Sequence, residues 1–283
     1  MQPQIIDTHV HIWNFDKAKY AWLDGDTSIL NRNHDISELE PYRQQAGITE
    51  GILVQAANNL EDTAWMLQVA EQTSWIKGVV GWAPLLDPEA TYQTLETYKK
   101  NVYIKGIRHL IHNEADPHWL LQPQVLESLA IVEAAGLSYD IVGIIPLHIE
   151  TALKLAEKFP RLRMVFDHLN QPPIAAKERF GRWGELMWKA SKYPNLYCKI
   201  SGLGTASQNL DGWANDDLEP YINFVLKLFG SDRCFCGGDW PVSLLAGSYE
   251  KTWLSIQSIL SKLLDADAQA DVLYHNAKHF YRL

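Results

Sequence analysis

The residues best suited to chemistry lie near the start of the chain, in the run Ile5-Ile6-Asp7-Thr8-His9-Val10-His11. In a β-strand, side chains at positions i and i+2 point to the same face. His9 and His11 therefore present two imidazoles side by side at the end of an apolar strand. Such a pair can bind one divalent metal ion or polarise one carbonyl oxygen. Alone, the spacing is a moderate signal, since it also occurs by chance.

Titratable side chains also close several later apolar runs. Asp239 is the hardest to explain structurally, because a carboxylate ending the apolar run Cys234–Gly238 is costly without a partner. His112 and His148 follow two runs closely enough to remain candidates. The other side chains are Arg108 with His109, Tyr139 with Asp140, Asp167 with His168, and Lys199 with Ser201.

Strand alternation allows only one member of an adjacent pair to face a common site. Of Arg108 and His109, we expect Arg108 to face it. Of Asp167 and His168, we expect His168 in the site and a structural role for the aspartate.

Two further positions keep a structural alternative. The pair Tyr139-Asp140 has the same ambiguity, and Asp140 could simply pair with a basic neighbour. Lys199 could equally be a paired or snorkelling core residue.

The elements that must position these groups repeat along the chain as short apolar runs separated by segments of helical period. Continuous hydrophobicity within the runs indicates strands buried on both faces, hence a parallel sheet. Eight such strands predict an α/β fold, a single (β/α)8 TIM-type barrel forming one domain over residues 1–283. An open doubly wound sheet is the alternative, but no Gly-x-Gly-x-x-Gly follows the first strand. The runs are Ile5–His11, Gly51–Ala56, Ile76–Trp82, Tyr103–Leu110, Leu137–Gly143, Arg163–Leu169, Leu196–Ser201 and Cys234–Asp239.

Composition excludes several classes of partner. The net charge of −9 disfavours nucleic acid and anionic membranes. No run reaches the roughly 18 apolar residues of a membrane span, and no leader precedes Ile5, so we expect a cytoplasmic protein. The three cysteines, at positions 198, 234 and 236, fit reduced core thiols. The sequence gives no indication of the oligomeric state.

In a barrel of this kind the carboxyl ends of the strands meet at one mouth, where the chemistry takes place. Asp239 facing His9, His11 and His168 there could act as a general base toward water. The histidines could polarise a carbonyl directly or through one metal ion. A nearby guanidinium could stabilise an oxyanion. A water nucleophile is favoured, because no Ser or Cys in a strained turn suggests an acyl-enzyme.

Together these residues resemble the amidohydrolase superfamily, with Asp7-Thr8-His9-Val10-His11 on the first strand, His168 on a later one and Asp239 on the eighth. More narrowly, the chain resembles the sugar-lactonase branch, of L-fuconolactonase and L-rhamnonolactonase type, which is related to the pyrone-dicarboxylate lactonases. The likeness covers nearly the whole chain. It is carried by Tyr20–Leu23, Gly78–Trp82, Gly106–Leu110, Tyr139-Asp140, Phe166–Leu169, Cys198–Leu203 and Gly238–Val242.

The resemblance implies a hydrolase acting on a carboxylic ester, a sugar aldonolactone. Asp239 would be the general base, and His9, His11 and His168 would bind the metal or the lactone carbonyl. Substrate contacts would come from Arg108, His109, Tyr139, Lys199 and Trp240.

The resemblance also implies at most one divalent metal ion, zinc by preference, held by His9, His11 and Asp239. The dinuclear members have a bridging Lys or Glu after strand four and a His after strand five, whereas this chain has other residues in both regions. Since a lactone is an activated ester, we expect the metal to be dispensable. A second departure is Gly238, where the branch usually has Ser.

Aromatic residues suit a sugar substrate, whose C–H face stacks on rings while its hydroxyls find polar edges. The chain has eleven tryptophans, most of which we expect to pack between barrel and helices. Trp240, beside Asp239, is our choice for a wall of the pocket. Two other functions stay open: a metal-dependent decarboxylase of an aromatic or unsaturated acid, and a non-catalytic binder of a sugar acid.

Overall fold

Eight strands form one parallel sheet that follows chain order from β1 to β8. The computed structural model describes residues 4–283. Beside β8, the amide of His11 donates to the Trp240 carbonyl at 2.7 Å, so the two ends of the sheet meet. The expected (β/α)8 barrel is confirmed. Its strands are β1 (Ile6–Val10), β2 (Glu50–Val54), β3 (Ile76–Gly81), β4 (Ile104–His109), β5 (Ser138–Ile141), β6 (Met164–Phe166), β7 (Leu196–Ile200) and β8 (Cys234–Cys236).

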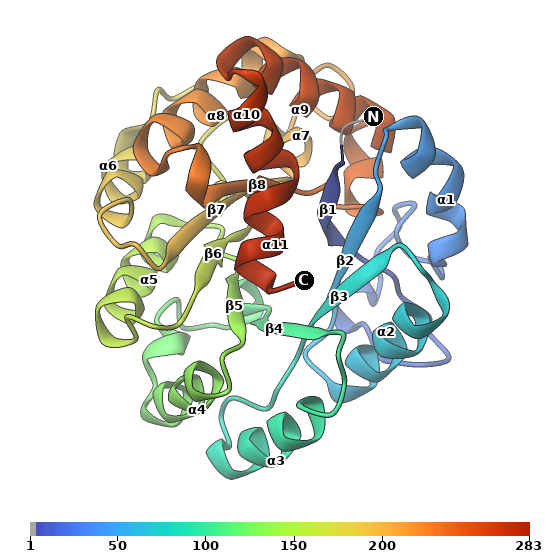
Figure 1. Cartoon of the computed structure of the whole chain (residues 1–283), viewed down its shortest axis with the longest axis vertical. Coiled ribbons are helices and arrows are strands. Elements are labelled where there is room, and N and C mark those ends of the chain that lie inside the picture. The colour runs from blue at the N-terminus through green and yellow to red at the C-terminus, as the bar shows by residue number, and fades with distance from the viewer. Residues whose placement is uncertain (1–3) are drawn as a thin grey trace.

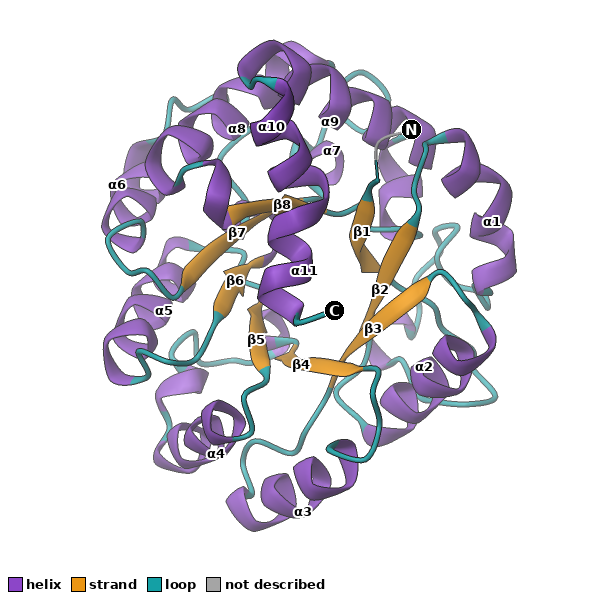
Figure 2. Ribbon diagram, viewed as in Figure 1, coloured by secondary structure: helices purple, strands orange, loops and turns teal. Residues whose placement is uncertain are grey.

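Helices surround the ring of strands (Figure 2). Their starts follow local capping chemistry: the side chain of Asn59 accepts a hydrogen bond from the Asp62 amide and begins α2. The helices are α1 (Ile36–Gln45), α2 (Leu60–Gln72), α3 (Pro88–Tyr98), α4 (Pro123–Ala134), α5 (Pro146–Lys158), α6 (Gly181–Ala190), α7 (Leu203–Ala206), α8 (Asn215–Phe229), α9 (Tyr249–Leu263), α10 (Ala266–Ala270) and α11 (Asn276–Tyr281).

The last helix, α11, lies across the middle of the ring of strands (Figure 1). Its residues Phe280 and Tyr281 are buried against apolar side chains from the strands. Aromatic and aliphatic packing therefore closes the amino-terminal end of the barrel. Only the carboxyl end remains for a site. The strand side chains in this cluster are Ile6, Ile52, Val54, Val80, Val165 and Phe235.

Two features of the composition have structural counterparts. The three cysteines are free and buried, as expected of core thiols. Within residues 4–283, none of the helices combines the length and apolarity that crossing a bilayer requires.

Candidate active site

A cavity of about 420 Å³ opens at the carboxyl ends of the strands. Its volume lies in the range of small-molecule sites. Titratable side chains gather at its base, while aromatic and polar side chains from the loops form its walls. The lining residues are His11, Trp13, Trp22, Ala56, Arg108, Leu110, His112, Asn113, Val142, Ile144, His168, Gln171, Gly202, Thr205, Ala206, Gln208, Asp239 and Val242.

His9 and His11 come from the end of β1, and their Nε2 atoms lie 3.1 Å apart. His11 Nδ1 is 2.7 Å from the Val54 carbonyl, which can only accept, so this nitrogen carries the proton. The Nε2 atom of a neutral His11 is therefore a free acceptor. Burial lowers the pKa of both imidazoles, which keeps them neutral near pH 7.

Asp239 follows β8 and directs Oδ1 toward these imidazoles, at 3.7 Å from His9 Nε2 and 3.6 Å from His11 Nε2. Its own amide donates to the His9 carbonyl at 2.8 Å, which fixes the carboxylate relative to β1. Asp239 has a left-handed backbone (φ 57°). Such conformations are uncommon outside glycine and cluster at functional sites.

His168 reaches the same point from a tight turn after β6. Four consecutive residues, 168–171, have positive φ. This reversal brings His168 Nε2 to 3.9 Å from Asp239 Oδ1. On the other side of the ring, Nδ1 lies 2.9 Å from the hydroxyl of Ser201, which fixes the ring plane.

Arg108, at the end of β4, is held on several sides. Its Nε donates to the Gln55 side chain at 3.1 Å, and Nη2 donates to the Gln55 carbonyl. Its Nη1 donates to Asp167 Oδ2 at 3.0 Å and lies 3.3 Å from His9 Nε2. A guanidinium can only donate hydrogen bonds, so His9 Nε2 must be the acceptor in this contact and carries no proton.

Below the cavity lies a group of buried charges. Lys199 Nζ is 2.7 Å from Asp140 Oδ2 and 2.8 Å from Asp167 Oδ1. Burial alone would lower the pKa of Lys199, but the two carboxylates outweigh it and raise the pKa. Together with the guanidinium of Arg108, the two cations balance two carboxylates inside the barrel.

All of these residues lie within a segment that the profile of a known family matches. The amidohydrolase family profile matches residues 6–283. The chain belongs to this family.

Amidohydrolases of known structure or name align over the whole length. The chain is 33% identical to an L-fucono-1,5-lactonase of Burkholderia ambifaria, over 98% of this chain and 95% of that protein. A crystal structure of an amidohydrolase from Burkholderia multivorans with bound zinc superposes with a TM-score of 0.91 at 26% identity, over 99% of both chains. A probable 2-pyrone-4,6-dicarboxylic acid hydrolase from Acinetobacter baumannii shares the fold, with a TM-score of 0.78 at 17% identity over both whole chains.

Four expected substrate contacts of this amidohydrolase do not line the cavity. His109 points away from the barrel axis, accepting from Trp82 Nε1 at 3.0 Å and bonding Glu114 Oε1 at 2.7 Å. Tyr139 is fully buried and packs in the core between strands and helices. Side chains alternate between the two faces of a strand, which explains both positions. The neighbours Arg108 and Asp140 are paired between β4 and β5 and face the interior of the barrel, so His109 and Tyr139 face outward.

Trp240 is the third. Only 1% of its surface is exposed, and its ring packs edge-on against His34. Its place as a pocket wall is taken by Trp13 and Trp22, which lie edge-to-face with their centroids 5.4 Å apart. A residue adjacent to Asp239 in the chain thus turns into the core, because the chain bends sharply after β8.

Lys199 is the fourth expected substrate contact. It is fully buried beneath the cavity and pairs with two carboxylates, in line with the structural alternative considered for it. His112 lines the cavity. His148 does not line it, and its Nδ1 accepts a hydrogen bond from the Ile144 amide. Gln55, which holds Arg108, was not among the predicted site residues. The signal that could have identified it is a polar side chain inside the apolar run Gly51–Ala56, directly after the last residue of β2.

Gly238, the departure from the sugar-lactonase pattern, sits against a clamp between β1 and β8. The Asp7 carboxylate accepts from the Gly238 amide at 2.8 Å and from the Tyr249 hydroxyl at 2.7 Å. A Cβ at this glycine would lie 2.5 Å from Asp7 Oδ2. A serine would therefore require this clamp to shift.

The donor set fits a single divalent cation. His9, His168 and Asp239 each offer one ligand atom, and these atoms lie within 4.8 Å of one another. His11 adds a lone pair within 3.6 Å of the same carboxylate oxygen. These acceptor atoms converge with no proton between them, and a bound cation would stabilise such an arrangement.

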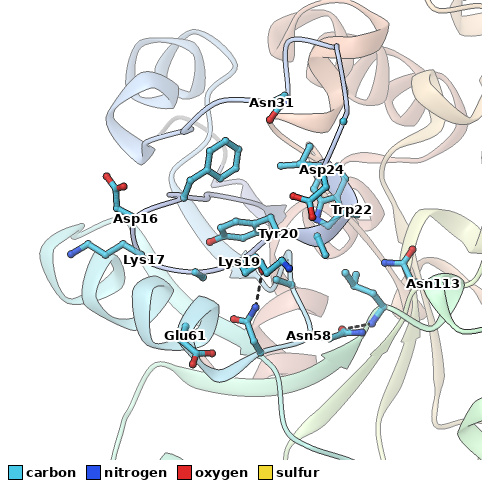
Figure 3. A pocket seen from close by; sticks show the side chains of 18 residues that line it. Asp16, Lys17, Lys19, Tyr20, Trp22, Asp24, Asn31, Asn58, Glu61 and Asn113 are labelled. Atoms are coloured by element: carbon cyan, nitrogen blue, oxygen red, sulfur yellow. Dashed lines mark hydrogen bonds between the residues drawn. The ribbon is translucent and has the colours of Figure 1, made fainter.

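A larger hollow of about 1010 Å³ is lined mainly by the loop between β1 and α1. Figure 3 shows Lys19, Tyr20 and Asn58 along it. It shares Trp22, Leu110 and Asn113 with the smaller cavity but contains none of the converging histidines or Asp239. Size alone therefore does not mark the amidohydrolase site, and the smaller cavity is the candidate.

Proposed function

We propose that this amidohydrolase opens a sugar aldonolactone with water. The observation that carries the proposal is the position of Asp239, whose carboxylate faces three neutral imidazoles at 3.6–3.9 Å at the base of the cavity. The similarity to an L-fucono-1,5-lactonase at 33% identity supports this substrate class. We propose L-fucono- or L-rhamnono-lactone as the type of substrate.

The reaction follows from the roles of two residues. Asp239 takes a proton from water, and the water oxygen attacks the lactone carbonyl carbon. The carbonyl electron pair moves to its oxygen, where the guanidinium of Arg108, which lines the cavity, supplies positive charge. The tetrahedral intermediate then expels the ring oxygen, which receives the proton back from Asp239. The product is the open-chain aldonic acid.

His9, His11 and Asp239 would hold a divalent metal, which we propose to be zinc, and His168 could complete the set. When bound, such an ion polarises a carbonyl and lowers the pKa of bound water. Arg108 already places a positive charge 3.3 Å from His9 Nε2. We therefore propose that the metal assists the reaction without being required.

The cavity walls suit a polyhydroxylated ring. Trp22 is 36% exposed, and its indole nitrogen is fixed by the Ala56 carbonyl. Gln171, Gln208 and Thr205 bring hydrogen-bonding groups to the same cavity. In the described part of the chain, the buried Thr205 hydroxyl has no partner, so a ligand hydroxyl could supply one.

The test is hydrolysis of a panel of 1,4- and 1,5-aldonolactones, including the L-fucono, L-rhamnono, D-arabinono and D-galactono compounds. Acid release is followed with a pH indicator and corrected for spontaneous opening. We expect fast opening of one stereochemical group. No activity on any lactone, with and without added zinc, would contradict the proposal.

A further inference from the structure

The carboxyl-terminal helix contacts the charged groups beneath the candidate site. α11 lies across the ring of strands (Figure 1), whereas the cavity is lined by residues that follow the carboxyl ends of the strands. Its last residue, Tyr281, is 1% exposed. The hydroxyl of Tyr281 donates to Asp140 Oδ2 at 2.6 Å. This bond joins two residues that are 141 positions apart in the chain. Most of the surrounding side chains of α11 are apolar, so this polar contact needs a reason.

Asp140 depends on that hydroxyl. Its Oδ2 receives hydrogen bonds from Tyr281 and from Lys199, at 2.6 and 2.7 Å. Its Oδ1 has no hydrogen-bond partner among residues 4–283. Among these residues, Lys199 is therefore the one other side chain that donates to this carboxylate. The remaining bond would leave the carboxylate free to rotate about a single contact.

Lys199 carries the connection upward to the site. Its ammonium lies between Asp140 and Asp167, and 3.3 Å from Nδ1 of His9. Asp167 Oδ1 is 3.5 Å from the same Nδ1 atom. The five side chains from Tyr281 to His9 are each at most 1% exposed, so their contacts are shielded from bulk water.

We propose that Tyr281 is a positioning residue for the candidate active site. Its hydroxyl fixes Asp140, which shares Lys199 with Asp167. That arrangement sets the orientation of the His9 imidazole. Groups behind a metal-binding or catalytic histidine commonly change affinity or rate by about 10- to 100-fold when removed. The kinetic part of this inference rests on the proposed lactonase function, whereas the metal-binding part does not.

The test compares Tyr281→Phe with Tyr274→Phe. Tyr274 is a matched control, since its hydroxyl also lies in the carboxyl-terminal segment but contacts Lys278 rather than Asp140. We expect Tyr281→Phe to lower kcat about tenfold with KM within twofold, because the cavity walls are untouched. We also expect a several-fold weaker Kd for zinc alone, measured by competition with a chromophoric chelator. Tyr274→Phe should leave both quantities unchanged.

A double-mutant cycle with Asp140→Asn shows whether the effect passes through Asp140. The loss caused by Tyr281→Phe should largely disappear in the Asp140→Asn background. If that background does not fold, the comparison with Tyr274→Phe decides the question. Equal kcat and zinc Kd in the two phenylalanine variants, or full additivity in the cycle, would overturn the inference. If the wild type opens no lactone, the function fails, while the zinc Kd still tests Tyr281.

Discussion

Asp239 Oδ1 and His168 Nε2 lie 3.9 Å apart, although the two residues follow different strands and both have left-handed backbone. Gly202, after β7, lies against both side chains. A Cβ on this glycine would be 2.5 Å from His168 Nδ1 and 2.9 Å from Asp239 Oδ2. The absence of a side chain at position 202 is therefore what allows the carboxylate and the imidazole to share one cavity.

Gly202→Ala should reduce lactone hydrolysis by about 10- to 100-fold, because a displacement of about 1 Å of reacting groups can cost this much. Its backbone φ of +60° adds a destabilisation of roughly 1–2 kcal/mol. Gly25→Ala is the control, since Gly25 also has positive φ but a Cβ there meets nothing within 4 Å. Kinetics and urea unfolding of both variants separate the two effects. Equal activity in the two variants would refute the crowding argument.

Asp239→Asn should lower kcat by about 10³-fold, because an amide cannot take a proton from water. The fold should persist, since the Asp239 amide still donates to the His9 carbonyl. The measurements are steady-state kinetics and circular dichroism. A folded variant with turnover near that of the wild type would rule out the general-base role.

Removal of divalent metal should leave most of the activity. The guanidinium of Arg108 lines the cavity and can stabilise the oxyanion of an activated ester. The measurement is lactone hydrolysis after dialysis against a chelator, with residual metal quantified. Loss of activity that zinc or manganese restores would show instead that the ion is essential.

Asp62 should make stability depend on pH. Its carboxylate accepts from the Tyr20 hydroxyl and the Ala56 amide, yet burial raises its pKa to about 6. The folded state therefore holds a proton that the unfolded state has lost between about pH 4 and 6. The free energy of unfolding attributable to this group falls as pH rises through that window.

In Asp62→Asn this contribution is absent. The stability of the variant relative to the wild type should therefore increase between pH 4 and 7, by up to roughly 3 kcal/mol. Urea unfolding at several pH values measures the difference. A constant difference across this range would show that Asp62 titrates normally in the folded protein.

Much of the barrel could be predicted from the sequence, because it depends on local pattern. Apolar runs buried on both faces specify parallel strands, and parallel strands bring their carboxyl ends to one mouth. His9, His11, His168 and Asp239 therefore meet at the cavity from three segments of the chain, after β1, β6 and β8. The sequence pattern could not decide the orientation of His109, since alternation along a strand allows either Arg108 or His109 to face the barrel interior. In the structure His109 faces outward and stacks on Trp119.

The sequence by itself determined the residue types at the ends of the strands and the order in which those strands pair. Only the tertiary structure decided that Trp240 turns into the core, that Gly202 leaves room for the site, and that Tyr281 meets Asp140 from the opposite end of the barrel. The physical reason is range. Period and capping act within a few residues, whereas these contacts depend on backbone reversals and on closure of the ring, which no local pattern encodes.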